Sequence, residues 1–236
     1  MRTIEVVPPR VLAIYAHPDD AEISCGGTIA TWAKANSAIR LVVCTLGDKG
    51  AQSKGSLSAF EKIKLRAEEA ERSAHHLGVT ELVALGYPDG EVCNDEELRE
   101  KLVFQIREHR PDVLLCPDPT TIFFGSGFFN HRDHREIGMA SLDAAFPAAR
   151  LDGYFPGKLS AHSVQMALLS ATNTPDVIVD VASGLNEKIE AVAMHSSQVE
   201  YGELWLGQAL SNRAEEAARG SKFRYAEGFR MVQGGG

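Results

Sequence analysis

Short apolar runs alternate with longer helix-like stretches along this chain of 236 residues. The run over residues 11–15 is typical of a buried strand, and similar runs follow at 40–45, 79–85, 112–117, 165–169 and 177–181. Helical patterns lie between and after them, at 28–36, 59–77, 96–109, 135–149, 184–195 and 203–219. Strands that alternate with helices form parallel sheets, because each return to the same end of the sheet needs a crossover. We therefore predict an α/β fold, a Rossmann-like three-layer sandwich with a mostly parallel sheet and a short last strand near 223–229.

The alternation runs through the whole chain without a change in composition or a linker rich in Pro, Gly or Ser. We expect a single domain over residues 1–236, with a flexible tail at residues 234–236. No Gly-x-Gly-x-x-Gly motif follows the first strand, so the layering does not indicate dinucleotide binding.

The formal charge of −8 argues against a nucleic-acid or membrane partner, because phosphate-rich surfaces are bound by basic patches. A neutral or cationic small-molecule substrate is compatible with this negative charge. The first ten residues lack the apolar core of a signal peptide, and no apolar run approaches the roughly 18 residues of a membrane span, so we expect a cytoplasmic protein. The helices near the C-terminus can supply a subunit interface, so the sequence is compatible with a homo-oligomer.

The four cysteines are dispersed and form no Cys-x-x-Cys pair, which disfavours a zinc ribbon or a redox motif. Cys44 and Cys116 lie inside apolar runs and are expected to be buried. Cys25 lies near the polar loop that follows the first strand, which leaves a contact with that loop open.

That loop, residues 16–20, reads Ala-His-Pro-Asp-Asp. In open α/β sheets, ligands bind at the carboxyl ends of the strands, which is where this loop lies. His17 and Asp20 can direct one nitrogen and one oxygen toward a single cation, a donor set that suits zinc. Asp19 is then free for another role.

A catalytic zinc site normally has three protein ligands and an open fourth position, so a further ligand is needed. Residues 131–134, His-Arg-Asp-His, are the obvious source, because they follow the strand at 112–117 and open a helix.

Each motif alone has a simpler interpretation. Asp19 or Asp20 can act as a helix N-cap, and two histidines three residues apart often make only surface hydrogen bonds. Their joint occurrence, each after a predicted strand, favours a metal site.

Two other segments have a structural and a functional interpretation. Arg66 and Glu69 lie on the helix at 59–77, where their spacing favours a solvated face with intrahelical ion pairs. Asp89 lies in a Pro-Asp-Gly turn, whose ordinary role is turn formation.

Taken together, these motifs resemble the LmbE/PIG-L family of zinc-dependent deacetylases over nearly the whole chain. The resemblance is carried by the Ala-His-Pro-Asp-Asp loop and the later His-x-Asp-His, supported by residues 26–28, Arg66 with Glu69, Asp89, and Lys188 before His195-x-x-Gln198.

The resemblance implies specific roles. His17, Asp20 and His134 would be the ligands of one zinc ion per chain, although another divalent metal would suit the same donors. Asp19 would be the general base, and His131 would donate to the developing oxyanion and later protonate the leaving amine. Asp133 would orient or tune the first histidine, and the pair Arg66 and Asp89 would help to hold a sugar.

The chain departs from the family pattern at two positions. Arg132 stands where the family often has proline, and Phe129 lies near a tyrosine that helps to bind the oxyanion in some sugar deacetylases. Phenylalanine cannot donate a hydrogen bond, so we assign no such role to Phe129. The aromatic loop at 118–130 indicates that the acceptor side of the site differs from that of the best-known family members. Exposed phenylalanines there would form an apolar lid or rim, although packing beneath the loop is the commoner fate of such side chains. We expect loops 47–58, 86–95, 118–130 and 150–162 to form the rim of the pocket.

The leading hypothesis is therefore hydrolytic removal of an N-acetyl or other N-acyl group from an N-acetylglucosamine-type amino sugar or its conjugate. Alternatives within the same family are an amidase of a thiol–sugar conjugate and a zinc-dependent hydratase. A metal-binding, receiver-like regulatory module is the non-enzymatic alternative, but such a module has no use for His131 and His134.

Overall fold

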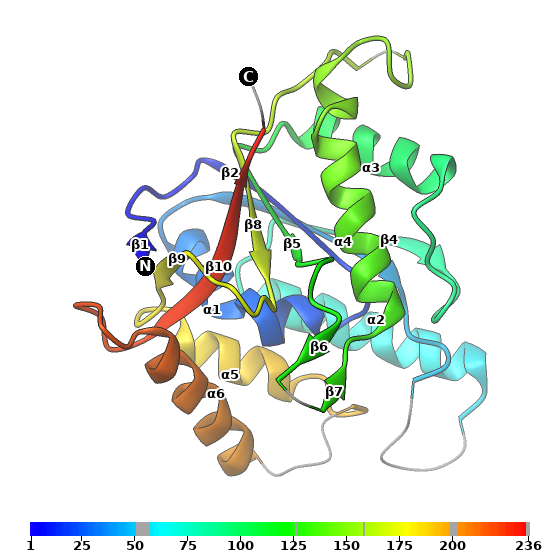
Figure 1. Ribbon diagram of the computed structural model, residues 1–236. Helices are drawn as coiled ribbons and strands as arrows, with labels where there is room; N and C mark the ends of the chain where they lie inside the picture. The colour runs from blue at the N-terminus through cyan, green and yellow to red at the C-terminus, as the bar shows by residue number, and fades with distance from the viewer. Residues whose placement is uncertain (51–56, 126, 158, 199–202, 235–236) are drawn as a thin grey trace.

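The computed structural model describes residues 1–50, 57–125, 127–157, 159–198 and 203–234. Within these ranges an eight-stranded sheet has the order β1-β9-β10-β8-β5-β2-β3-β4 (Figure 1). Neighbouring strands are parallel except β10, which runs antiparallel to both β8 and β9. The strands are β1 (Arg2–Thr3), β2 (Arg10–Tyr15), β3 (Ala38–Thr45), β4 (Glu81–Tyr87), β5 (Val113–Pro117), β8 (Met166–Ser170), β9 (Val177–Asp180) and β10 (Ala226–Gln233).

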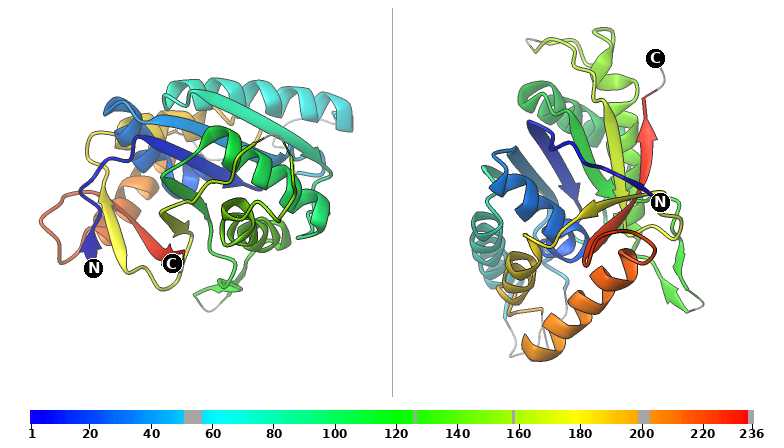
Figure 2. Two further views of the ribbon diagram at one scale, coloured as in Figure 1. Left: turned by 90° about the horizontal axis from the view of Figure 1, so that it is seen from above. Right: turned by 90° about the vertical axis from the view of Figure 1, so that its left-hand side faces the viewer.

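Helices cover both faces of this sheet, so that the molecule has three layers (Figure 2). The helices are α1 (Asp20–Lys34), α2 (Ala59–His76), α3 (Glu96–His109), α4 (Arg132–Ala145), α5 (Leu185–Ala193), α6 (Glu203–Ala217) and the short 3-10 helix η1 (Ala148–Arg150). A small hairpin of β6 (Phe123–Phe124) and β7 (Phe128–Phe129) projects beside the sheet (Figure 1). The predicted α/β sandwich with a mostly parallel sheet is confirmed.

The central strand β2 shows why both faces are covered. Its side chains alternate between the two layers, as the twofold period of a strand requires. Ala13 and Tyr15 join the core beneath α1, α2, α5 and α6, whereas Leu12 and Ile14 join the core beneath α3 and α4. A strand buried on both faces reads as a continuous apolar run, which is how this one could be recognised in the sequence.

The order of the strands reverses beside β2. From β2 the chain builds outward through β3 and β4, and it then returns to place β5 on the opposite side of β2. Such a switch point leaves a crevice at the carboxyl ends of the two strands, where ligands bind in open α/β sheets. The loop after β2 and the segment from β5 to α4 both lie at this edge.

Helix α1 begins eight residues earlier than the sequence pattern predicted, because it consists of two pieces. Cys25 has non-helical backbone angles, φ −145° and ψ 20°, so the helix is interrupted there. The second piece starts at the Gly-Gly step, where the backbone amides of Gly27 and Thr28 donate to the carboxylate of Glu227 from β10. The glycines therefore mark the interruption and not the start of the helix.

Three of the four cysteines are buried. Cys44 and Cys116 are buried as predicted, and Cys25 is also buried, with its Sγ 3.1 Å from the hydroxyl of Tyr15. Most of the loop at 51–58 and the end of the tail at 234–236 lie outside the described residues. No helix in the described part of the chain is long and apolar enough to cross a membrane.

Candidate active site

The polar residues singled out in the sequence meet at the carboxyl edge of the sheet. His17, Asp19 and Asp20 lie between β2 and the first turn of α1, and Asp89 follows β4. The His-Arg-Asp-His segment forms the start of α4, with His131 as its N-cap. Residues more than a hundred positions apart are thus neighbours at the switch point of the sheet.

Donor atoms of three side chains lie close together at the centre of this group. His17 Nδ1 is 3.3 Å from His134 Nε2 and 3.3 Å from Asp20 Oδ2. The other oxygen of Asp20, Oδ1, lies 3.1 Å from His134 Nε2. Two imidazole nitrogens and one carboxylate therefore face a common point, as the three protein ligands of a catalytic metal site do.

The opposite edge of the His17 ring faces two carboxylates. His17 Nε2 is 3.0 Å from Asp89 Oδ1 and 3.3 Å from Asp133 Oδ2. Burial opposes a charge on His17, but hydrogen bonds with Asp133, Asp20 and Asp89 outweigh it and raise the pKa of His17 to about 12. The acidic surroundings of this ring thus favour a positive charge at its position.

Asp133 and Asp89 are anchored by backbone contacts as well. Asp133 Oδ2 accepts a hydrogen bond from the amide of Gly90 at 2.7 Å, and the amide of Asp89 donates to Asp48 Oδ1 at 2.9 Å. The hydrogen bond to His17 lowers the pKa of Asp89. Burial opposes ionisation of Asp133, but hydrogen bonds with His17 and the Gly90 amide outweigh it and lower the pKa of Asp133. Both groups are therefore carboxylates that hold the Nε2–H of His17, the arrangement that commonly orients a metal-ligating histidine.

Asp19 does not cap α1, although it occupies the N-cap position. Its side chain makes no capping hydrogen bond, and its φ of 96° lies in the left-handed region, which is uncommon for residues other than glycine. Burial, followed by the charge of Asp20, raises the pKa of Asp19 to about 7, against the opposing effect of Arg66. Asp20 behaves differently, because His134 and His17 hold its pKa well below the usual range despite burial. Adjacent carboxyl groups with separated pKa values suit different roles.

Arg66 and Glu69 do not form a solvated face, so that interpretation was wrong. Arg66 is buried, and its guanidinium donates to the backbone oxygens of Pro18 and Gly47 while lying 3.7 Å from Asp19 Oδ2. Glu69 has 0% exposure and accepts hydrogen bonds from the Ser197 amide and from the hydroxyls of Ser196 and Ser197. The spacing on α2 could not reveal that these loops cover this part of the helix.

The ring of His131 has one nitrogen engaged and the other available. Its Nδ1 accepts a hydrogen bond from the amide of Asp133 at 3.2 Å, which caps α4. An accepting Nδ1 leaves the hydrogen of a neutral imidazole on Nε2. Burial and the nearby charges of His17 and His134 lower the pKa of His131, and this favours the neutral ring. His131 can therefore offer an N–H donor from Nε2.

Asn130 is a residue that the sequence analysis missed. It precedes His131, it is buried, and its Oδ1 lies 3.1 Å from Nδ1 of His134. Its only signal in the sequence is its position directly before the histidine motif.

Three of the four phenylalanines of the aromatic loop are exposed and do not pack beneath it, and Phe124 is half-buried. Exposure is 57% for Phe123, 69% for Phe128 and 58% for Phe129. Cross-strand pairing brings Phe123 against Phe129 and Phe124 against Phe128, with ring centroids 5.6 and 6.2 Å apart. Arg135 from α4 stacks on the ring of Phe129 at 4.8 Å.

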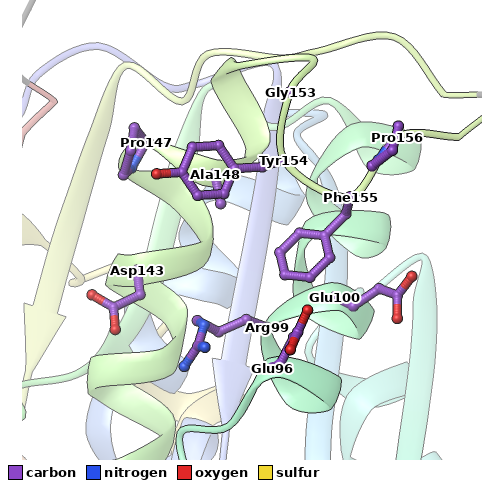
Figure 3. Close-up of a pocket in the computed structure, with 10 residues that line it drawn as sticks. All are labelled: Glu96, Arg99, Glu100, Asp143, Pro147, Ala148, Gly153, Tyr154, Phe155 and Pro156. Carbon is purple, nitrogen blue, oxygen red and sulfur yellow. The ribbon is translucent and has the colours of Figure 1, made fainter.

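A separate cleft of about 660 Å³ lies between α3, the end of α4 and the loop after η1 (Figure 3). Its lining includes Arg99, Asp143, Tyr154 and Phe155, and none of the candidate site residues. The segment over 153–156 thus lines this cleft and not the histidine–aspartate cluster. Arg107 fixes that segment by donating to five backbone oxygens, those of Ala148, Ala149, Leu151, Tyr154 and Phe155.

The donor set of the cluster fits a divalent metal ion. Two groups of side chains have ligand atoms within 4.8 Å of one another, His17 with His131 and His134, and His17 with Asp89 and Asp133. Nitrogen and carboxylate oxygen donors without thiolate are typical of catalytic zinc and of related divalent metals. Fold and site together define a three-layer α/β protein with a candidate metal centre at its switch point.

Comparison with known proteins identifies the family. Residues 12–145 match the family profile described as PIG-L, GlcNAc-PI de-N-acetylase. The chain is 34% identical over 231 residues to diacetylchitobiose deacetylase from Thermococcus kodakarensis, covering 95% of this chain and 84% of that protein. It is 28% identical to 1D-myo-inositol 2-acetamido-2-deoxy-alpha-D-glucopyranoside deacetylase from Nakamurella multipartita, over 97% and 90% of the two chains.

A solved structure agrees with these similarities. N,N'-diacetylchitobiose deacetylase from Pyrococcus horikoshii superimposes with a TM-score of 0.85 at 30% identity, over 96% of this chain and 84% of that one. The chain belongs to the PIG-L family. These three relatives are deacetylases, which are hydrolases of amide C–N bonds, so the expected family and enzyme class are confirmed.

Proposed function

We propose that this protein is a zinc-dependent hydrolase that removes the N-acetyl or another N-acyl group from an N-acetylglucosamine-type amino sugar or its conjugate. The observation that carries the proposal is the close approach of His17 Nδ1, the Asp20 carboxylate and His134 Nε2, at pairwise distances of 3.1 to 3.3 Å, beside an Asp19 that caps nothing. The names of the relatives, which refer to acetylated amino sugars, supply the substrate class.

His17, Asp20 and His134 would hold the metal ion. We prefer this set to one containing His131, because the Nδ1 of His131 accepts from the Asp133 amide, which places the ring hydrogen on Nε2 and leaves no lone pair there for a metal. Zinc bound there would act as a Lewis acid toward the amide carbonyl of the substrate and toward water. The carboxylates of Asp89 and Asp133 accept from the Nε2–H of His17, so its Nδ1 carries the lone pair that can bind the metal.

Asp19 would be the general base. Its side chain caps nothing and lies directly beside the ligand Asp20 in the sequence, and its burial raises the pKa of this carboxyl, which favours uptake of a proton from water. The water oxygen forms a bond to the carbonyl carbon while Asp19 takes the water proton. When the C–N bond breaks, Asp19 returns that proton to the leaving nitrogen, a step that the family resemblance assigned to His131, and the products are a carboxylic acid and a free amine.

His131 would stabilise the negative charge that develops on the carbonyl oxygen. Its Nε2–H is the donor left available by the capping contact, and donors aimed at a developing oxyanion contribute strongly to the rate of acyl transfer. Arg66 would position the loop that carries Asp19, because it donates to the Pro18 carbonyl. A direct role for Arg66 and Asp89 in holding the sugar stays a prediction. The cytoplasmic location, the single domain and the formation of a homo-oligomer also stay predictions.

The test is product analysis by mass spectrometry with a panel of N-acetylated amino sugars, their conjugates and simple amides. The proposal predicts equal amounts of carboxylate and free amine from at least one amino sugar. A hydratase would release no amine, so amine detection separates that alternative. Two results together would rule out the proposed reaction: no acetate is released from any compound, and His17→Ala abolishes no activity that wild type shows.

A further inference from the structure

Asn130 links the aromatic hairpin to the candidate metal ligand His134. It lies between β7 and the N-cap of α4 and is only 2% exposed. Its backbone amide donates to Ile122 O at 2.8 Å, and its backbone oxygen accepts from Arg135 Nη1 at 2.7 Å. Both ends of its side-chain amide are also engaged.

The contacts of that amide determine its orientation. One end lies 2.7 Å from the backbone oxygen of Thr121, which can only accept, so this end must be the Nδ2 donor. The other end is then Oδ1, an acceptor, and it faces His134 Nδ1 at 3.1 Å. A hydrogen bond between them requires the hydrogen on His134 Nδ1.

This assignment has a direct consequence for the opposite side of the ring. A neutral imidazole with its hydrogen on Nδ1 has a lone pair on Nε2. Nε2 is the atom that faces Asp20 Oδ1 at 3.1 Å and His17 Nδ1 at 3.3 Å. With the Nδ1 hydrogen held by Asn130, a metal ion can take the place of a hydrogen on Nε2 between His134 and Asp20, so Asn130 fixes the ring orientation in which His134 can bind a metal.

We infer that Asn130 is a positioning residue that fixes His134 as an Nε2 metal ligand. The inference rests on the proposed metal site but not on the identity of the substrate. The two histidines are held differently, because His17 faces the carboxylates of Asp89 and Asp133 whereas His134 faces a neutral amide. A neutral acceptor orients the ring without adding another negative charge to a site that already contains four aspartates.

A purely structural role is the competing explanation, since Asn130 Nδ2 also anchors the base of the hairpin. Two substitutions separate the roles. Asn130→Asp keeps an oxygen facing His134 and loses the donor to Thr121, whereas Asn130→Leu keeps the approximate size and loses both contacts. Asn173→Leu is the matched control, because Asn173 Nδ2 donates to Phe123 O at 2.7 Å and so anchors the same hairpin from an exposed position.

The experiment is a zinc titration of each metal-free full-length protein against a chromophoric chelator, with circular dichroism to check the fold. Loss of a group that orients a ligating histidine typically weakens metal binding by about 10- to 100-fold. We expect that loss for Asn130→Leu, an affinity within about threefold of wild type for Asn130→Asp, and no change for Asn173→Leu.

Zinc binding by Asn130→Leu at wild-type strength would overturn the inference. Equal weakening by Asn130→Asp and Asn130→Leu would also overturn it, because it would assign the effect to the hairpin anchor. Tight zinc binding by wild type without hydrolysis of any N-acyl compound would contradict only the proposed function. A wild-type protein that binds no zinc would contradict both.

Discussion

Lys188 Nζ lies 2.5 Å from Glu227 Oε1 in the protein interior, beside the interruption of α1. The Glu227 carboxylate also accepts hydrogen bonds from the amides of Gly27 and Thr28, so it caps the second piece of the helix. A Cβ at Gly26 would approach the Lys188 side chain to 3.2 Å, which shows how closely α5 packs there. This ion pair connects α5, the antiparallel strand β10 and the helix whose first turn contains Asp20.

Breaking this ion pair is expected to destabilise the fold strongly. Lys188→Met leaves the Glu227 carboxylate buried without its counter-charge, and such changes cost about 3–5 kcal/mol of unfolding free energy. Adding Glu227→Gln to Lys188→Met removes the unpaired charge and should recover most of that loss. Urea unfolding of both single variants and the double variant measures the coupling. A loss below about 1 kcal/mol for Lys188→Met would show that the pair contributes little.

Close packing of α4 on β5 should make Gly138 sensitive to substitution. A Cβ at Gly138 would lie 2.4 Å from the backbone oxygen of Pro117, so Gly138→Ala must displace α4 and with it His131 and His134. Overpacking of this kind costs about 1–3 kcal/mol. We expect lower thermal stability and weaker zinc binding.

Gly207→Ala is the control for that prediction. Gly207 lies in α6, where a Cβ would meet Ile189 at an ordinary 3.5 Å. Alanine is the better helix former by up to about 1 kcal/mol, so this variant should be at least as stable as wild type. Equal thermal stability and equal zinc affinity of Gly138→Ala and Gly207→Ala would contradict the packing argument.

His109 should make the fold less stable in acid. Burial, with further contributions from Arg10 and Arg40, lowers the pKa of His109, and its Nε2 contacts the backbone oxygen of Val11 at 2.9 Å. The unfolded chain therefore binds a proton at higher pH than the folded protein does. The stabilisation linked to His109 is full above its unfolded pKa of about 6.5 and is lost as the pH falls through and below that value.

The comparison is between wild type and His109→Gln, whose unfolding free energies are measured from pH 7.5 to 5. Both proteins retain the candidate metal site, so its titration cancels in the difference. The advantage of wild type over the variant should shrink as the pH falls. A constant difference across this range would show that His109 is not held neutral by the fold.

Metal removal should lower the stability of the protein. An ion that binds only the folded state stabilises it by RT ln(1 + [L]/Kd), which is about 2.7 kcal/mol at a hundredfold excess over Kd. We expect a chelator to lower the melting temperature of wild type and to leave that of His17→Ala unchanged. A chelator that shifts neither protein would exclude a metal held by this cluster.

The parts of the fold and site that the sequence revealed share a local origin. The loop at 16–20 and the histidines at 131 and 134 follow apolar strands, and parallel strands end at one edge, so their meeting could be predicted. Helix α3 could also be predicted with its correct bounds from its amphipathic pattern, which is a local signal, and in the structure Asp95 caps it.

The parts that could not be predicted depend on distant contacts. The burial of Arg66 comes from the loops at Pro18 and Gly47, and that of Glu69 from the segment at 196–197. The interruption of α1 is stabilised by Glu227, two hundred residues away, so the sequence pattern revealed only the second piece of this helix. Asn130 looks like any loop asparagine until its amide is seen between Thr121 and His134.

The two adjacent aspartates, Asp19 and Asp20, differ in their contacts and in their proposed roles. Asp20 contacts both candidate histidine ligands, whereas Asp19 contacts neither of them through a described hydrogen bond and lies 3.7 Å from Arg66. Removal of a general base typically lowers the rate by about 10²- to 10⁴-fold while leaving the metal in place.

The most direct measurement determines bound zinc and the turnover of an N-acetylated amino sugar for Asp19→Asn and Asp20→Ala in parallel. We predict that Asp19→Asn keeps about one zinc ion per chain and loses turnover, whereas Asp20→Ala loses the metal and turnover together. Zinc retained by Asp20→Ala and lost by Asp19→Asn would contradict the assignment of the site.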